Sequence, residues 1–161
     1  MGGTASVFTD IVGSTEKAAE LGDGRWAELL ERHNALVRTE VSRFDGQEMD
    51  TSGDGFFAVF GEPADALDAA AGIRAAVDSL GLRIRIGIHI GDCWIADDKC
   101  TGLAVHIGAR IAALAGPGEI LVSQALKTAV EPDYSFTDRG ETELKGVPGR
   151  WHLYALQGGW S

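Results

Sequence analysis

The sequence predicts an α+β domain with a ferredoxin-like βαββαβ core, an antiparallel-rich sheet and flanking helices. Strand-like and helix-like segments are mixed along the chain, and a hairpin-like pair of strands falls in the middle of the order. This mixture argues against a fully parallel sheet. The 161 residues suffice for one domain with its own core, so we expect a single domain over residues 1–161.

Each expected element follows from its local pattern. Alternating or continuous apolar residues bounded by turn signals predict strands, and apolar residues spaced 3, 4 and 7 apart predict amphipathic helices. The expected strands cover residues 5–9, 47–51, 56–60, 82–88, 93–96, 120–122, 134–136, 143–145 and 151–156. A helix opens at Gly13-Ser14-Thr15, with Ser14 or Thr15 as its N-cap, and the helical pattern covers 26–41, 63–80, 102–114 and 124–130.

The composition narrows the classes of function. The formal net charge of −10 disfavours a nucleic acid partner, because nucleic-acid-binding domains usually carry a basic face. The sequence has no long apolar run and no signal-peptide pattern, so we expect this segment to make no membrane contact. Two cysteines without a CxxC pair indicate a reducing, cytoplasmic location. Because the chain starts almost directly on a strand, we expect it to be a domain of a longer protein.

Two aspartates lie at predicted strand ends. Asp10 ends the first strand in FTDIVGST, and Asp54 lies at the tip of the hairpin in TSGDGFF. If the first strand pairs beside the hairpin, both carboxylates converge at one end of the sheet. Two carboxylates with room for water are typical ligands of Mg²⁺ or Mn²⁺, and a pair of such ions can activate a hydroxyl and stabilise a leaving phosphate. Either aspartate alone is more simply a turn residue, but their joint occurrence favours a metal site.

Phosphate-binding candidates accompany the aspartates. The helix start at Gly13-Ser14-Thr15 offers free N–H groups and the positive end of a helix dipole. His106 and Arg110 are four residues apart and share a helix face, from which Arg110 could hold a phosphate in a forked contact. Lys145 lies at a strand end before a turn and could meet a phosphate as a point charge. In isolation, His106 is more simply a core histidine, and Arg110 and Lys145 are surface cations.

Four segments, in the right order, resemble the class III adenylate/guanylate cyclase catalytic domain and, more narrowly, its actinobacterial-type members. They are FTDIVGST, TSGDGFFAVF, GLAVHIGARIAALAGPGEILVS and ELKGVPGRW, within a resemblance that covers residues 6–156. It implies a ferredoxin-like domain that pairs head to tail into a homodimer with active sites at the interface. It also implies that ATP or GTP is converted into a 3′,5′-cyclic nucleotide and pyrophosphate.

The resemblance assigns roles at the metal and the triphosphate. Asp10 and Asp54 would bind two Mg²⁺ or Mn²⁺ ions, with the Ile11 carbonyl as a further ligand. The backbone from Val12 to Thr15 would contact the triphosphate. The ribose 3′-hydroxyl would attack the α-phosphorus in line, and no covalent enzyme intermediate is needed. Catalysis would then consist of positioning and charge stabilisation.

The resemblance also assigns roles to residues that reach the site from the partner subunit. Arg110 and Lys145 would bind phosphates and, with the second metal ion, would neutralise charge as pyrophosphate leaves. His106 takes a position where many relatives have an asparagine that positions the ribose and helps the transition state. Histidine is familiar there in the bacterial branch, so we do not expect it to inactivate the domain.

The base-reading positions depart from the adenylate pattern. Asp50 stands where adenylate-type members carry lysine, and Lys99 stands where they carry aspartate or threonine. Guanine offers an N1–H donor and an O6 acceptor, the reverse of adenine, so an acid at 50 and a donor at 99 complement guanine. A one-residue shift of the loop would bring Asp98 or Cys100 to the base instead. On the base rate of the family we expect ATP as the substrate, with GTP as the alternative.

Three rival interpretations remain at this point. A degenerate cyclase domain that binds nucleotide without turnover is favoured by the altered purine pair and opposed by the intact metal and phosphate residues. A diguanylate cyclase would need a GG[DE]EF-type turn, which the segment around Asp54 lacks. A purely structural domain would leave the four motifs unexplained.

Overall fold

The computed structural model describes residues 4–52, 54–92, 94–96 and 99–157. The strands are β1 (Thr4–Ile11), β2 (Gln47–Ser52), β3 (Gly55–Phe60), β4 (Ile84–Gly91), β5 (Trp94–Ala96), β6 (Lys99–Thr101), β7 (Ile120–Ser123), β8 (Phe136–Leu144) and β9 (Val147–Leu156). The helices are α1 (Ser14–Leu21), α2 (Asp23–Arg43), α3 (Pro63–Asp78), α4 (Leu103–Leu114) and α5 (Gln124–Val130).

A seven-stranded mixed sheet forms the centre of the domain, in the order β2-β3-β1-β4-β7-β9-β8. The pairing of β4 with β7 is parallel, and the other pairings within this sheet are antiparallel. A separate two-stranded sheet contains β5 and β6. The predicted α+β class and the antiparallel-rich sheet are therefore confirmed, and β1 lies beside the β2–β3 hairpin as the metal-site argument requires.

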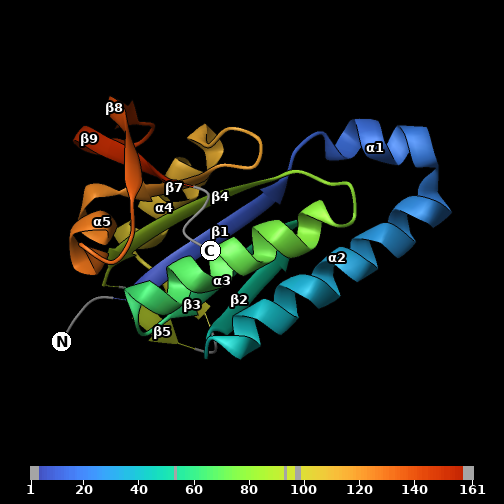
Figure 1. Ribbon diagram of the computed structural model, residues 1–161, viewed down its shortest axis with the longest axis horizontal. Helices are drawn as coiled ribbons and strands as arrows, with labels where there is room; N and C mark the ends of the chain where they lie inside the picture. The colour runs from blue at the N-terminus through green and yellow to red at the C-terminus, as the bar shows by residue number, and fades with distance from the viewer. Residues whose placement is uncertain (1–3, 53, 93, 97–98, 158–161) are drawn as a thin grey trace.

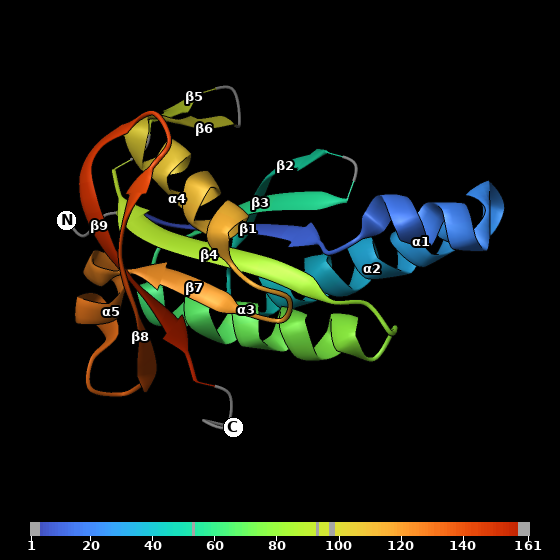
Figure 2. The same ribbon diagram turned by 90° about the horizontal axis from the view of Figure 1, so that it is seen from above.

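Helices cover both faces of the large sheet (Figure 1). Seen from above, α2 and α3 lie over one face and α4 over the other, and α1 projects beyond the end of β1 (Figure 2). The side chains of β1 alternate between these faces, because successive residues of a strand point to opposite sides. Val7 joins the main core on the α3 side, whereas Phe8 lies under α4, next to Gly108. Asp10 shares the parity of Phe8 and so faces the α4 side.

Two glycines allow α4 to lie close against the sheet. A Cβ at Gly87 of β4 would come within 2.2 Å of the backbone nitrogen of Ala112 in α4. A Cβ at Gly108 of α4 would come within 3.0 Å of the Phe8 ring. Real Cβ atoms essentially never come as close as 2.2 Å to another heavy atom, and 3.0 Å is tighter than most real Cβ contacts. The distance between helix and sheet therefore depends on the missing side chains.

Three sequence-based expectations are wrong in detail. Neither Ser14 nor Thr15 is the N-cap of the first helix, because Gly13 takes that position with a φ of 67° and no side-chain cap. The helical pattern is broken at Gly22, which separates α1 from α2 at a φ of 85°. The two short strands expected at 134–136 and 143–145 are one continuous strand, β8, whose mostly exposed residues hide the alternation.

Candidate active site

Asp10 lies near the end of β1, directly opposite Arg85 of β4. A guanidinium nitrogen of Arg85 is 3.9 Å from a carboxylate oxygen of Asp10. The pKa of Asp10 is nevertheless raised above its ordinary value, first because burial disfavours the charged form and then because the Asp54 carboxylate is nearby. The structure therefore holds two acidic groups close together with one partly exposed cation beside them.

Asp54 lies in the turn that leads into β3, and β3 is the strand next to β1. It borders an open cleft of about 290 Å³ together with Ser14 and Thr15 of α1. Trp26 and Leu30 of α2 form the apolar wall of this cleft. The hairpin and the start of α1 are thus brought to one place, as the two sequence motifs predict.

The N-terminus of α1 presents backbone donors to this cleft. The first N–H groups of a helix have no intrahelical acceptor, and the positive φ of Gly13 turns the chain sharply from β1 into the helix. The N–H of Val12 is already engaged, since it donates to the carbonyl of Arg83 at 2.9 Å. The amides of Gly13, Ser14 and Thr15 are therefore the ones best suited to a phosphate oxygen.

The donor set fits a hard divalent cation. Among the described residues there is no group of three or more His, Cys, Asp or Glu side chains that could hold a metal ion. Two carboxylates and the backbone carbonyl of Ile11 are oxygen donors, which Mg²⁺ and Mn²⁺ prefer, and Mg²⁺ usually keeps several waters or substrate oxygens. The mutual repulsion that raises the pKa of Asp10 is the kind that a bound cation relieves.

His106 and Arg110 lie on the exposed face of α4. The opposite face of the helix is buried against the sheet through Ala104, Ile107, Gly108, Ile111 and Ala112. The exposed face also carries Leu103 and Leu114, which are 56% and 46% exposed. Large apolar side chains this exposed, on both sides of two polar functional candidates, are typical of an interaction surface.

Lys145 lies in the tight turn between β8 and β9, fully at the surface. Within the described part of the chain, no hydrogen bond or ion pair links Lys145, His106 or Arg110 to Asp10 or Asp54. One protomer therefore brings together the metal and helix-start candidates but leaves the other three residues without a connection to them.

Asp50 and Lys99 belong to β2 and β6, which approach each other. The Asp50 side chain is exposed and lies directly opposite Phe57 of β3. The Lys99 and Cys100 side chains are not described, and Asp98 lies outside the described residues. Asp50, the acid of the expected purine-reading pair, thus lies on one face of β2, and only the backbone position of Lys99 is described.

The family model for the adenylate and guanylate cyclase catalytic domain matches residues 3–158. The chain belongs to this family. It is 26% identical to a receptor-type adenylate cyclase of Trypanosoma congolense over 93% of its own length. The cyclase domain spans 27% of the length of that protein, and 16–23% of the length of two Rhizobium meliloti relatives.

Solved cyclase structures share the fold of this cyclase domain. The adenylyl cyclase CyaB of P. aeruginosa superposes with a TM-score of 0.88 at 22% identity, over 98% of this chain and 95% of that chain. The guanylate cyclase domain of RhGC from Catenaria anguillulae, solved in complex with GTP, gives 0.88 at 18% identity, over 97% and 96%. These superpositions show the fold, and the family match over residues 3–158 shows that the domain is an adenylate/guanylate cyclase catalytic domain, a lyase. The two solved structures are one adenylyl cyclase and one guanylate cyclase.

The sequence reasoning missed Arg85 as the neighbour of Asp10. The alternation of residues 82–88 predicts that Arg85 faces away from Ile84 and Ile86, but not which residue it meets. Only the antiparallel register of β1 and β4 brings it opposite Asp10. Its Nε atom is buried and has no hydrogen-bond partner among the described residues.

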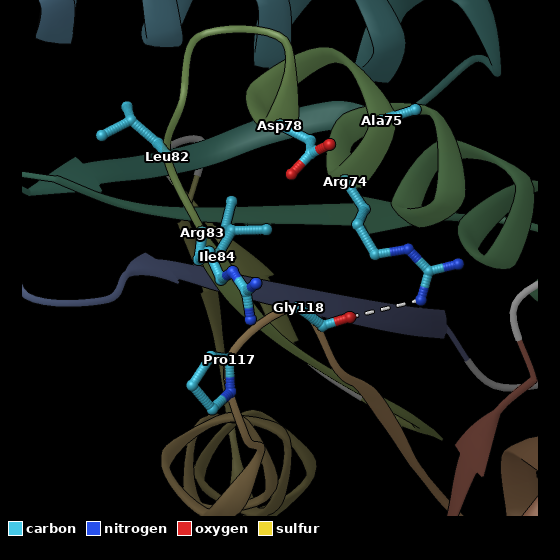
Figure 3. Close-up of a pocket in the computed structure, with 8 residues that line it drawn as sticks. All are labelled: Arg74, Ala75, Asp78, Leu82, Arg83, Ile84, Pro117 and Gly118. Atoms are coloured by element: carbon cyan, nitrogen blue, oxygen red, sulfur yellow. Dashed lines mark hydrogen bonds between the residues drawn. The ribbon is translucent and has the colours of Figure 1, made fainter.

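A second cleft of about 370 Å³ lies between α3 and the loop before β7 (Figure 3). Arg74, Asp78 and Arg83 line it, and Arg74 donates to the carbonyl of Gly118 at 3.4 Å. None of the residues expected to bind metal, triphosphate or base borders this cleft. The residues that the sequence singled out as metal and helix-start candidates lie instead at the Asp10–Asp54 end of the sheet. Of the described helices, none is long and apolar enough to cross a membrane.

Proposed function

We propose that this chain converts ATP into 3′,5′-cyclic AMP and pyrophosphate. The observation that carries this proposal is the juxtaposition of the Asp10 and Asp54 carboxylates beside the open start of α1. A cation site next to a backbone anion site is suited to a metal-bound triphosphate. The adenylate cyclase name of the Trypanosoma congolense relative supports ATP as the substrate.

Two Mg²⁺ or Mn²⁺ ions are the cofactors that we propose. Asp10 and Asp54 would hold them, with the carbonyl of Ile11 as a further ligand. When bound, such ions lower the pKa of a coordinated hydroxyl and neutralise charge on the phosphates. Residues of the protein would orient the triphosphate and balance the rest of its charge.

The triphosphate is bound in this proposal from two sides. The amides of Gly13, Ser14 and Thr15 donate to phosphate oxygens from the end of α1. The Arg85 guanidinium, 3.9 Å from Asp10, supplies a cation beside the same position. The leaving pyrophosphate gains negative charge, and Arg110 and Lys145 of a second copy neutralise it. Preorganised charges of this kind act without reorganisation at the moment of bond breaking.

His106 would position the ribose. It lies one helical turn from Arg110 on the exposed face of α4, so both side chains approach a ligand from the same direction. A neutral imidazole can both donate and accept a hydrogen bond, as an asparagine amide can. His106 can therefore take over the orientation of a ribose oxygen without acting as a nucleophile.

A head-to-tail homodimer completes the site in this proposal. Within the described part of one protomer, no hydrogen bond or ion pair links His106, Arg110 or Lys145 to Asp10 or Asp54. The exposed Leu103 and Leu114 bracket the α4 residues and would become buried in a partner interface. Two equivalent active sites per dimer follow from the symmetry. We also infer a cytoplasmic location, where the nucleotide substrate is abundant, for this domain of a longer protein.

A guanylate cyclase is the second candidate function. Asp50 is exposed on β2 and offers only acceptors when ionised, which suits the N1–H and the exocyclic amine of guanine better than the N1 of adenine. Lys99 would supply the donor for O6. The related structure from Catenaria anguillulae, a guanylate cyclase domain with GTP, supports this reading.

Product analysis tests the proposal. Purified protein is incubated with Mg²⁺ or Mn²⁺ and either ATP or GTP, and cyclic nucleotide and pyrophosphate are measured separately. We expect one pyrophosphate per cyclic AMP, no product in EDTA, and a slower reaction with GTP. Cyclic GMP as the main product would replace the first candidate by the second. Nucleotide binding without any cyclic product, from protein that is dimeric, would leave a degenerate cyclase domain that binds nucleotide without turnover.

A further inference from the structure

The edge strand β2 carries an irregularity just before Asp50. Glu48 lies opposite Ala58 and Asp50 opposite Phe57, so the register shifts at Met49, which is the extra residue of a β-bulge. Ala58 belongs to the main core under α2 and α3, whereas Phe57 packs with Phe8 and Val105 on the α4 side. The bulge therefore turns Glu48 toward α2 and Asp50 toward the α4 face of the sheet.

A charged network closes over this bulge. The Arg38 guanidinium of α2 donates through Nε at 2.9 Å and through a terminal nitrogen at 3.3 Å to the two carboxylate oxygens of Glu48. The hydroxyl of Thr51 donates to the same carboxylate. Glu48, the residue before the bulge, is thus linked to Thr51, the residue after Asp50, and to Arg38 of α2.

The network is anchored on the core side as well. The guanidinium carbon of Arg38 lies 5.3 Å from the centre of the Phe56 ring, and Phe56 is the register partner of Thr51. The pKa of Glu48 lies below its ordinary value, because hydrogen bonds first from Arg38 and then from Thr51 favour its charged form. A forked guanidinium–carboxylate pair fixes orientation, which a single point-charge contact does not.

An edge strand has one free side, so its geometry depends on such contacts. Within the part of the chain that the structure describes, β3 is the one neighbour of β2 in the sheet, and a one-residue slip would move Asp50 to the opposite face. We infer that Arg38, Glu48 and Thr51 form a clamp that holds the β2 bulge and so positions Asp50 as the base-reading residue. This inference rests on the proposed function, in which Asp50 contacts the purine. Arg38 and Glu48 are positioning residues: they select the base through Asp50 and touch no substrate.

Base selectivity tests the clamp. The variants Arg38→Gln and Glu48→Gln each break the forked pair, and Lys127→Gln removes the remote Lys127–Glu131 pair at 2.5 Å as the matched control. The readouts are the ratio of kcat/KM for ATP and GTP, and the ratio of affinities for fluorescent ATP and GTP analogues without turnover. We expect each clamp variant to shift both ratios by about three- to tenfold, mainly through KM, and the control to leave them unchanged.

Two further comparisons separate the clamp from general stability. The charge exchange Arg38→Glu with Glu48→Arg should restore part of the ratio, whereas either reversal alone should not. In an Asp50→Ala background, Arg38→Gln should change the ratio no further, because the clamp acts through Asp50. The melting temperature is followed for every variant.

The outcomes distinguish the clamp from the proposed function. Absence of any cyclic product or nucleotide binding by the unaltered protein overturns both. A ratio that changes in Asp50→Ala but not in Arg38→Gln or Glu48→Gln overturns the clamp alone. A ratio that Asp50→Ala itself leaves unchanged overturns the role of Asp50 and the clamp with it, while cyclase activity stands.

Discussion

Asp10 and Arg85 lie directly opposite each other on neighbouring antiparallel strands, with a guanidinium nitrogen 3.9 Å from a carboxylate oxygen. The pair is about half-exposed at Asp10 and about one-third exposed at Arg85, so its contribution to stability is small. In the proposed function, this cation lies beside the carboxylate that binds a metal ion and faces the triphosphate, so its expected effect is on ligand binding.

Replacing Arg85 by glutamine should have opposite effects on metal binding and on turnover. Removing a cation beside Asp10 should tighten Mn²⁺ binding to the nucleotide-free protein about two- to fivefold. It should also lower kcat/KM about tenfold or more, because a phosphate loses a counter-charge. Titration calorimetry with Mn²⁺ and initial-rate kinetics measure the two effects. Arg83→Gln, which changes an exposed neighbour, is the control, and no difference between the two variants would make Arg85 a bystander.

We predict that one methyl group added between α4 and the sheet destabilises the domain. In Gly87→Ala the new Cβ would lie 2.2 Å from the Ala112 backbone nitrogen, so α4 must shift. We expect a loss of about 1–3 kcal/mol in the free energy of unfolding, together with lower cyclase activity, since α4 carries His106 and Arg110. Urea unfolding measures the first quantity. Gly24→Ala, at a position with nothing within 4 Å, should stay within about 0.5 kcal/mol; an equal loss there would refute the steric argument.

His89 should make stability depend on pH. It is 6% exposed, and burial lowers its pKa to about 4. The backbone N–H of Leu126 donates to the Ser123 hydroxyl, which is therefore free to donate its own proton to Nδ1 of His89 at 2.7 Å and so holds the neutral ring. Between pH 6.5 and about 4 the unfolded chain takes up a proton that folded His89 does not. The free energy of unfolding should therefore fall as the pH drops through this window, by up to about 3 kcal/mol.

The variant His89→Asn isolates this contribution. An asparagine side chain can still accept from Ser123 but does not titrate. Urea unfolding gives the free energy of unfolding of both proteins at each pH between 7.5 and 4. The difference between the two free energies should shrink as the pH falls. A difference that stays constant over the whole range would mean that His89 takes up its proton equally in both states.

The sequence predicted the architecture well where periodicity and turn residues agree. The first strand, which runs one residue beyond the predicted end at Asp10, the turn at Asp54 and the fold class needed only local patterns and the pairing of β1 beside the hairpin. The separation of α1 from α2 was missed, because the helical pattern was read from the apolar spacing that begins at Trp26. The break lies at Gly22, at φ 85°, and the Gly22-Asp23-Gly24 segment is a turn signal in the sequence.

Details of the candidate site that depend on the register between strands could not be predicted from the sequence. The partner of Arg85 is set by the alignment of two strands, and no local pattern specifies that alignment. The direction of Asp50 is set by a bulge at Met49, which a strict two-residue period cannot reveal. Arg38, a helix residue ten positions before Glu48, had no motif at all and emerges only from its forked contact.

The most direct test of the account is complementation between two inactive variants. Asp10→Asn removes a proposed metal ligand, and Lys145→Ala removes a phosphate contact proposed to come from the partner subunit. Each variant alone should have less than about 1% of the unaltered activity. Mixed in equal amounts and allowed to exchange subunits, they should recover about a quarter, because half of the dimers are mixed and each of these has one intact site. A mixture that contains mixed dimers but makes no cyclic nucleotide would contradict an active site shared between two subunits.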